Sequence, residues 1–175
     1  MKTFNIRLLV VALVAMVISG NTIAQIKRVD ISATGLTCSM CSNAIYKQLE
    51  SMPQVAEITT DLNTNTFTVL IKEGAVVQPV ELRNAVEKAG FFVGSMQLTM
   101  NVDAEKMDAN STLTTPAGSF VFIDEVKFDR EAQYRVLDKG FITQKEYRAL
   151  AESYATHPSY LANKQNNYHL SVVKQ

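Results

Sequence analysis

The sequence predicts an α+β fold in two parts, and three observations support this prediction. In the first hundred residues, four short segments alternate apolar and polar residues, as half-buried strands do. Between them lie two longer segments whose apolar residues recur at helical spacing. The rest of the chain carries further strand-like runs around a single helix. We therefore expect a ferredoxin-like βαββαβ domain, followed by a small β-rich C-terminal module with one helix.

The N-terminal domain is expected at residues 25–98 and begins with a strand at 29–34. The helix that follows places four apolar side chains on one stripe, at spacings of four, four and three: Cys41, Ile45, Leu49 and Met52. Pro53 ends this helix. The remaining elements are expected as strands at 55–61 and 66–71, a helix at 79–89 and a strand at 92–98.

The second half of the chain carries weaker patterns. Residues 99–118 are polar and predict an extended segment that runs into a linker, and residues 119–175 predict the β-rich module. Within that module, strand-like runs are expected at 120–123, 133–137 and 168–173. Its helix begins after Thr143, which forms a capping box with Glu146. No function follows from these patterns.

Residues 1–24 have the composition of a secretory signal peptide. Two basic residues precede an apolar run at 8–19, and small residues precede the expected cleavage site after Ala24. The run is shorter than the ~20 apolar residues that span a bilayer, so we expect cleavage and no stable membrane insertion. The sequence therefore predicts an exported protein, with the periplasm as its destination.

Composition excludes several classes of protein. The 175 residues carry 17 basic and 17 acidic side chains with no basic block, which argues against nucleic acid as a partner. Two cysteines cannot form a disulfide framework. Two histidines and no tryptophan leave few residues for catalysis, and no Ser-His-Asp spacing or Gly-rich phosphate loop stands out. We therefore expect a protein that is not an enzyme, with no catalytic and no cofactor-binding residues.

The chemistry of the sequence is concentrated in Cys38 and Cys41, which two residues separate. The pair lies between the first strand and the first turn of the first helix, where the helix dipole favours thiolate over thiol. Two thiolates on an exposed loop can converge on one soft ion such as Cu(I). A structural zinc site would need four ligands, and the sequence offers no second cysteine pair. Cys38 and Cys41 are therefore the candidate metal ligands of a low-coordinate site.

The segment GLTCSMCSNAI resembles the GMTCxxC signature of the heavy-metal-associated domain family. SMPQV is similar to the PGV of that family, and VEKAGFFV is similar to the end of its second helix. The resemblance covers residues 27–98. That family includes copper chaperones, the metal-binding domains of copper-transporting ATPases and the periplasmic mercury-binding protein. Leu36 replaces the Met of the GMTCxxC signature, and Gln54 replaces the Gly of PGV.

The resemblance implies a metal-binding protein, foremost a Cu(I) chaperone or sequestration protein. Hg(II), Ag(I) and Zn(II) remain alternative ions, because two sulfur ligands do not separate them. The implied mechanism is thiolate ligand exchange with another CxxC metal-transport protein, without a free ion. Leu36 is expected to pack the loop in place of Met, and Phe91 to pack near it.

Two other functions compete with metal transport. The CxxC pair of an exported protein could act as a thiol–disulfide oxidoreductase, or rest as a disulfide. Alternatively, the protein is an interaction protein whose C-terminal module carries the function.

Other sulfur and imidazole groups are interpreted as structural. Met40 is expected to face solvent, and Met96, Met100 and Met107 to be packing or surface residues. The two histidines, His157 and His169, are expected at a helix end and on a strand surface, because no Cys or carboxylate partner is patterned near them.

Overall fold

The computed structural model of the chain describes residues 25–36, 39–102, 105, 107–108, 111–124, 132–157, 159–162 and 164–173. The expected signal peptide, residues 1–24, lies outside this part of the chain, and so does Cys38. Within the described ranges, no helix is both long enough and apolar enough to cross a membrane.

The described residues form strands and helices in both halves of the chain. The elements, in order, are β1 (Ile26–Thr34), α2 (Ser39–Glu50), β2 (Val55–Asp61), β3 (Thr66–Ile71), α3 (Pro79–Lys88), β4 (Phe92–Met100), β5 (Thr112–Thr115), β6 (Gly118–Phe122), β7 (Ala132–Val136), α4 (Gln144–Ser153), the short 3-10 helix η2 (Tyr160–Ala162) and β8 (Asn167–Val172).

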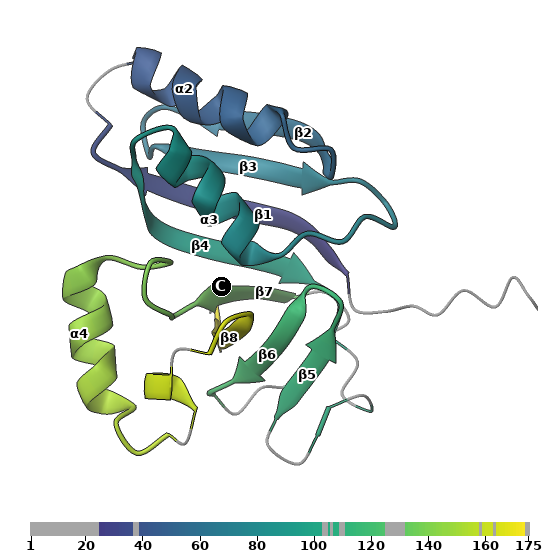
Figure 1. Cartoon of the computed structure of the whole chain (residues 1–175), viewed down its shortest axis with the longest axis vertical. Helices are drawn as coiled ribbons and strands as arrows, with labels where there is room; N and C mark the ends of the chain where they lie inside the picture. Colours follow the sequence, from purple (N-terminus) through teal and green to yellow (C-terminus); the bar gives the residue numbers. More distant parts are fainter. Residues whose placement is uncertain are drawn as a thin grey trace, which may run out of the picture.

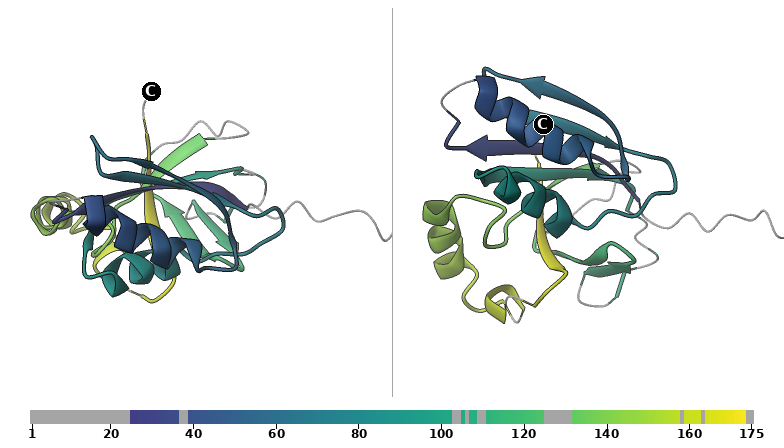
Figure 2. Two further views of the ribbon diagram at one scale, coloured as in Figure 1. Left: turned by 90° about the horizontal axis from the view of Figure 1, so that it is seen from above. Right: turned by 45° about the horizontal axis from the view of Figure 1, so that its top comes forward.

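All of these strands belong to one eight-stranded sheet, with the order β2-β3-β1-β4-β7-β8-β6-β5. Neighbouring strands are antiparallel, except that β6 and β8 run parallel. Helices α2 and α3 lie side by side over one face of β1 to β4 (Figures 1 and 2). Helix α4 lies outside this layer, next to the end of β7 (Figure 1).

The N-terminal part confirms the expected ferredoxin-like arrangement. The order βαββαβ and the strand order β2-β3-β1-β4 are both observed. In α2, Ile45 and Leu49 are fully buried, as their helical stripe predicts. In β1, the fully buried Val29 and Ile31 alternate with polar residues. The first and last strands of this part differ from expectation only at their ends, since β1 begins at Ile26 and β4 continues to Met100.

The separate C-terminal module that the sequence predicts is not confirmed. Strand β7 pairs with β4 from Gln97↔Arg135 to Met100↔Ala132, so the second half continues the sheet of the first. Residues 112–115, within the expected linker, form a strand that pairs with β6. The physical reason is that β4 would otherwise leave its outer backbone N–H and C=O groups unpaired at a sheet edge.

The two halves also share one hydrophobic core. Buried side chains of β6, β7 and β8 belong to the same cluster as those of β1, β3 and β4. Helix α3 contacts the second half directly, because the Val80 N–H donates to the Tyr168 hydroxyl over 3.4 Å. The Arg83 guanidinium lies 5.2 Å from the centre of the Phe141 ring. The N-terminal βαββαβ part and the C-terminal half therefore pack as one body.

Helix α4 is tied to the sheet by Arg135 of β7. The Arg135 guanidinium donates to Glu146 Oε1 and Oε2 over 2.5 and 2.7 Å, and its Nε donates to Ser95 Oγ over 3.1 Å. Thr143 accepts a hydrogen bond from the Glu146 backbone N–H, as its expected N-cap role requires. The Glu146 carboxylate thus joins α4 to β7 and, through Arg135, to β4.

Candidate functional site

Cys41 occupies the first turn of α2, as its third residue, and its side chain is half-buried. It stands one turn before Ile45 on the buried stripe, so the residue lies at the end of the core and is only partly covered. The first turn of α2 contains no acidic residue. The N–H groups at the start of a helix are unpaired and carry partial positive charge, which favours an anionic thiolate. Cys41 is therefore placed to act as a thiolate ligand.

The loop that leads from β1 to α2 begins at Gly35, whose φ of +86° suits glycine. The Phe91 ring lies beside it: Phe91 Cδ1 would be 3.9 Å from a Cβ placed on Gly35. Leu36 packs against the core from this loop, in agreement with the role expected for it. The two residues thus support the loop from its inner side. Cys38, the other candidate ligand, lies outside the described residues.

The methionines take the structural roles that the sequence predicts. Met40, between the two cysteine positions, is 80% exposed, so its thioether faces solvent. Met96 and Met100 are fully buried on β4, and Met107 packs against the core. These thioethers fill core space, and a methionine-based metal site does not follow from their positions.

A polar cluster in the second half was missed by the sequence analysis. His169 of β8 is only 1% exposed, so the expected strand-surface position is wrong. Its Nδ1 donates to Asp138 Oδ1 over 2.7 Å, and its backbone N–H donates to Asp138 Oδ2 over 2.6 Å. Its Nε2 lies 2.8 Å from Ser159 Oγ, and His157 Nδ1 lies 3.4 Å from the same oxygen. Strand pairing and the turn before β8 thus bring together residues that are far apart in sequence.

Aromatic rings enclose this cluster. The His157 and His169 ring centroids are 5.7 Å apart, and the Tyr160 centroid is 5.1 Å from that of His169. The Tyr160 hydroxyl donates to the Leu137 carbonyl over 2.7 Å. Burial, with a smaller contribution from the charge of Asp138, raises the pKa of Tyr160. Burial, and then the neighbouring His169, lower the pKa of His157.

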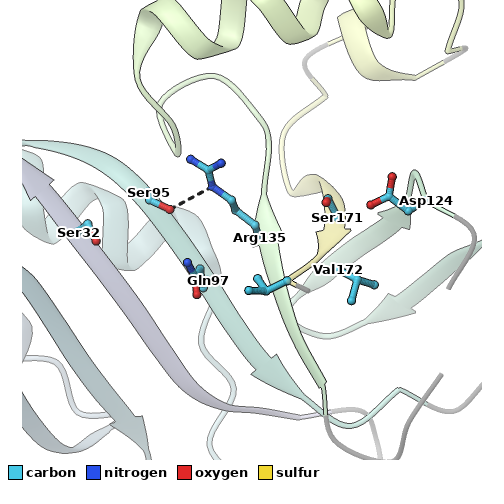
Figure 3. A pocket seen from close by; sticks show the side chains of 8 residues that line it. Ser32, Ser95, Gln97, Asp124, Arg135, Ser171 and Val172 are labelled. Carbon is cyan, nitrogen blue, oxygen red and sulfur yellow. Dashed lines mark hydrogen bonds between the residues drawn. The ribbon is translucent and has the colours of Figure 1, made fainter. Parts of the chain in front are cut away.

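A shallow pocket of about 700 Å³ opens on the sheet face opposite α2 and α3. Ser95 and Gln97 line it, and they alternate along β4 with the fully buried Met96 and Leu98. Figure 3 shows the Arg135 side chain directed from this face toward Ser95. Glu146 already neutralises Arg135, so the pocket offers hydroxyl and amide groups together with the carboxylate of Asp124. Its lining carries no set of groups with an evident chemical task.

The local sequence pattern gave no signal for the histidine cluster. In the run from Tyr168 to Val172, His169 and Ser171 hold the polar positions between apolar residues, which predicts an exposed imidazole. The structure buries His169 and gives it Asp138 as its partner. The identity of that partner depends on the pairing of β7 with β8, which the sequence patterns do not specify.

The sequence model of the heavy-metal-associated domain matches residues 30–92, about a third of the chain. That range spans the CxxC loop and both helices of the N-terminal part. No curated protein matches the chain.

Three solved structures of single domains are similar to the N-terminal part of the chain. The yeast copper transporter domain Ccc2a, studied in its apo and Cu(I)-loaded states, is 29% identical, with a TM-score of 0.34 over 37% of this chain and 88% of that domain. The N-terminal domain of a potential copper-translocating P-type ATPase from Bacillus subtilis, in its Cu(I)-loaded state, is 28% identical, with a TM-score of 0.34 over 38% of this chain and 82% of that one. The apo heavy-metal-associated domain of a copper chaperone for superoxide dismutase is 20% identical, with a TM-score of 0.35 over 43% of this chain and 70% of that one.

Proposed function

We propose that this chain, whose residues 30–92 match the heavy-metal-associated domain, binds a soft metal ion between the sulfurs of Cys38 and Cys41. Cu(I) is the leading ion, and Hg(II), Ag(I) and Zn(II) are the alternatives. The ion is then passed to another CxxC metal-transport protein or held in store. On this proposal the protein is a metal carrier and not an enzyme.

One observation supports the proposal above the others: Cys41 stands in the first turn of α2 with a half-buried side chain. A fully buried cysteine would be a packing residue, and its sulfur could not meet a partner. A fully exposed one would lack the positive field of the helix start. Cys38 lies three residues earlier in sequence, which is close enough for both sulfurs to reach one ion.

The metal passes between proteins by ligand exchange, during which its coordination number rises from two to three and then falls again. A Cu(I) ion held by two thiolates accepts a third thiolate from the partner, and one of the first two then leaves. The copper stays in its +1 state throughout, and only metal–sulfur bonds form and break. The exposed Met40 and Phe92 leave the surface beside the loop apolar, which suits close approach of a partner. The formal charge of the chain is zero, so local contacts and not long-range attraction select the partner.

A competition titration tests this proposal. The reduced chain and its Cys38→Ser and Cys41→Ser variants are titrated with Cu(I) against a chromophoric Cu(I) chelator. We expect one tightly bound equivalent in the unchanged chain and loss of tight binding in each variant. Wild-type affinity in either variant would refute the two-thiolate site. Met40→Ser serves as a matched control, because it removes an exposed sulfur that lies between the two cysteines in sequence.

The thiol–disulfide oxidoreductase is the competing interpretation of the same cysteines. Insulin-reduction activity that depends on Cys41, together with weak Cu(I) binding, would favour it. Catalytic activity should be absent if the pair serves metal transfer alone.

We further propose that the chain is exported to the periplasm after cleavage at Ala24. Mass determination of the protein recovered from the periplasmic fraction tests this directly. A mature chain beginning at Gln25 is expected, whereas an uncleaved chain in the membrane fraction would refute cleavage.

A further inference from the structure

The cluster around Ser159 is an arrangement that metal binding at the CxxC loop does not use. We propose that Ser159, activated by His169, is a nucleophile that hydrolyses neutral carboxylic esters through an acyl-serine intermediate. Ser159 directly precedes η2, and His169 lies on β8, so this activity belongs to the C-terminal half and needs no cysteine. Metal carriage in the N-terminal part involves no catalysis, whereas the C-terminal half adds an esterase, which revises the expectation of a chain without catalytic residues.

The first argument is that three side chains are joined as in a Ser-His-Asp triad. His169 Nδ1 donates to Asp138 Oδ1 over 2.7 Å, and His169 Nε2 lies 2.8 Å from Ser159 Oγ. Because a carboxylate only accepts, the proton of the neutral ring is on Nδ1, and Nε2 accepts the Ser159 hydroxyl proton. Asp138 also accepts the His169 backbone N–H over 2.6 Å, so its carboxylate is fixed and acts as a positioning residue. Such a triad is recognised by its geometry, whatever the order of its members in the sequence.

The second argument is that another imidazole supplies a donor beside the nucleophile. His157 Nδ1 lies 3.4 Å from Ser159 Oγ. The hydroxyl has a single proton, which it donates to His169, so His157 faces the same oxygen with its Nδ1–H as a donor. Burial, and then the neighbouring His169, lower the pKa of His157, so this ring stays uncharged near neutrality. Its N–H is placed to bind the oxyanion that forms when Ser159 attacks a carbonyl group.

The reaction follows from these two imidazoles. Ser159 Oγ attacks the carbonyl carbon of the ester while its proton moves to His169 Nε2, and the negative charge falls on the carbonyl oxygen beside His157. The bond to the alcohol oxygen then breaks, and His169 gives the proton to the leaving alkoxide. Water attacks the acyl-serine in the same way, with His169 again as base, and releases the carboxylic acid. Ester and water are consumed and alcohol and acid are formed, so no further reactant is needed.

Access and charge indicate the class of substrate. Ser159 and His157 are half-buried, so a small molecule can reach them, whereas His169 is only 1% exposed. The pocket described above adjoins this site, because Ser171 lines it (Figure 3) and lies on the same face of β8 as His169, two residues away. The carboxylate of Asp124 also lines the pocket and repels anions. A neutral ester is therefore favoured over an anionic one.

The hydrogen bonds of this cluster also have a structural consequence. Asp138 follows β7 and His169 belongs to β8, so their contact joins the two strands at one end. The Tyr160 hydroxyl donates to the Leu137 carbonyl over 2.7 Å and holds η2 to the same place. Neither contact requires a hydroxyl at Ser159. The reactivity of Ser159 therefore distinguishes a catalytic site from a structural link.

Covalent labelling tests the nucleophile directly. The full chain carrying both Cys38→Ser and Cys41→Ser, in which no thiol can react, is treated with a fluorophosphonate, and labelled peptides are identified by mass spectrometry. Ser159 Oγ should displace fluoride and retain the phosphonyl group. Labelling should be lost in Ser159→Ala and persist in Ser153→Ala, which removes an exposed hydroxyl at the end of α4. An unlabelled Ser159, or labelling that Ser159→Ala leaves unchanged, would overturn the proposal and leave the cluster as a structural link.

Hydrolysis of p-nitrophenyl acetate by the same cysteine-free chain tests the role of His157, with the Ser159→Ala chain as the background. His157→Ala removes the oxyanion donor and should lower kcat/KM on the order of 100-fold. His157→Asn keeps an amide N–H near the position of Nδ1–H and should recover most of this loss. His157 is half-buried, so both variants should fold, which circular dichroism checks. Unchanged kcat/KM in His157→Ala would overturn the oxyanion site. Because the cysteines are absent, none of these outcomes bears on the proposed thiolate site.

Discussion

Replacing Leu170 by alanine tests whether the two halves of the sheet unfold together. Leu170 lies on β8, is fully buried, and pairs with Val136 of β7 and Phe122 of β6. It belongs to the same apolar cluster as Leu98 and Val29 in the N-terminal half. The change should therefore be felt far from β8.

The expected cost follows from the burial of this side chain. Leu170 is fully buried on a strand flanked by β6 and β7, so its truncation leaves a cavity, and such changes cost about 3 kcal/mol. For a chain of this size, that corresponds to a fall in Tm of roughly 6–12 °C. Leu161→Ala is the matched control, because Leu161 is 52% exposed and its loss should change the free energy of unfolding by less than about 0.5 kcal/mol.

Denaturant unfolding and hydrogen exchange together give the measurement. Unfolding should remain a single transition with an unchanged m-value. The most protected amides of β1 should exchange faster in Leu170→Ala by a factor on the order of 100, because global unfolding exposes both halves. If the amides of β8 lose protection while those of β1 keep it, the two halves are independent units and the shared-core account is wrong.

Three further predictions concern single positions. Gly118→Ala should cost at least about 2 kcal/mol, because its Cβ would lie 2.7 Å from its nearest neighbours at a φ of +134°. Gly74→Ala, which also has positive φ but nothing within 4 Å, should cost only about 1 kcal/mol, and equal Tm values would contradict this reading. Burial raises the pKa of Tyr168 from 10.0 to about 12, so its contribution to folding is present below pH 10 and is lost between pH 10 and 12. The loss in unfolding free energy over that range should be smaller in Tyr168→Phe by on the order of 2 kcal/mol. If the unfolding free energies of the two chains fall in parallel between pH 10 and 12, the Tyr168 hydroxyl makes no such contribution. Met40→Ser should keep Cu(I) affinity within about twofold, whereas a tenfold loss would identify the thioether as a ligand.

The sequence is sufficient to predict the N-terminal fold because its signals are local. The stripe that contains Ile45 and Leu49, and the alternation in β1, each follow from residues within a few positions of one another. Pro79 and Gly90 mark the ends of α3 in the same way. The position of Cys41 in the first turn of α2 follows from these elements. Local periodicity was therefore sufficient to predict both the N-terminal fold and the position of Cys41.

The pairing of β4 with β7 could not be predicted in this way. Both strands are recognisable as strands, but nothing in the run from Gln133 to Leu137 indicates which edge it joins. Two polar contacts stabilise this arrangement across long sequence distances: Arg135 with Ser95, and Gln133 with Asp30. The cluster of Asp138, Ser159 and His169 depends on the same topology. Contacts of this kind emerge only when the order of strands in the sheet is known.

X-ray absorption spectroscopy of the copper-loaded chain tests the central claim most directly. The chain is reduced, loaded with one equivalent of Cu(I) and examined at the copper edge. The proposed site at Cys38 and Cys41 predicts a two-coordinate Cu(I) ion with two sulfur neighbours and no nitrogen or oxygen. Nitrogen or oxygen in the first coordination shell, or a single sulfur, would contradict a two-thiolate carrier.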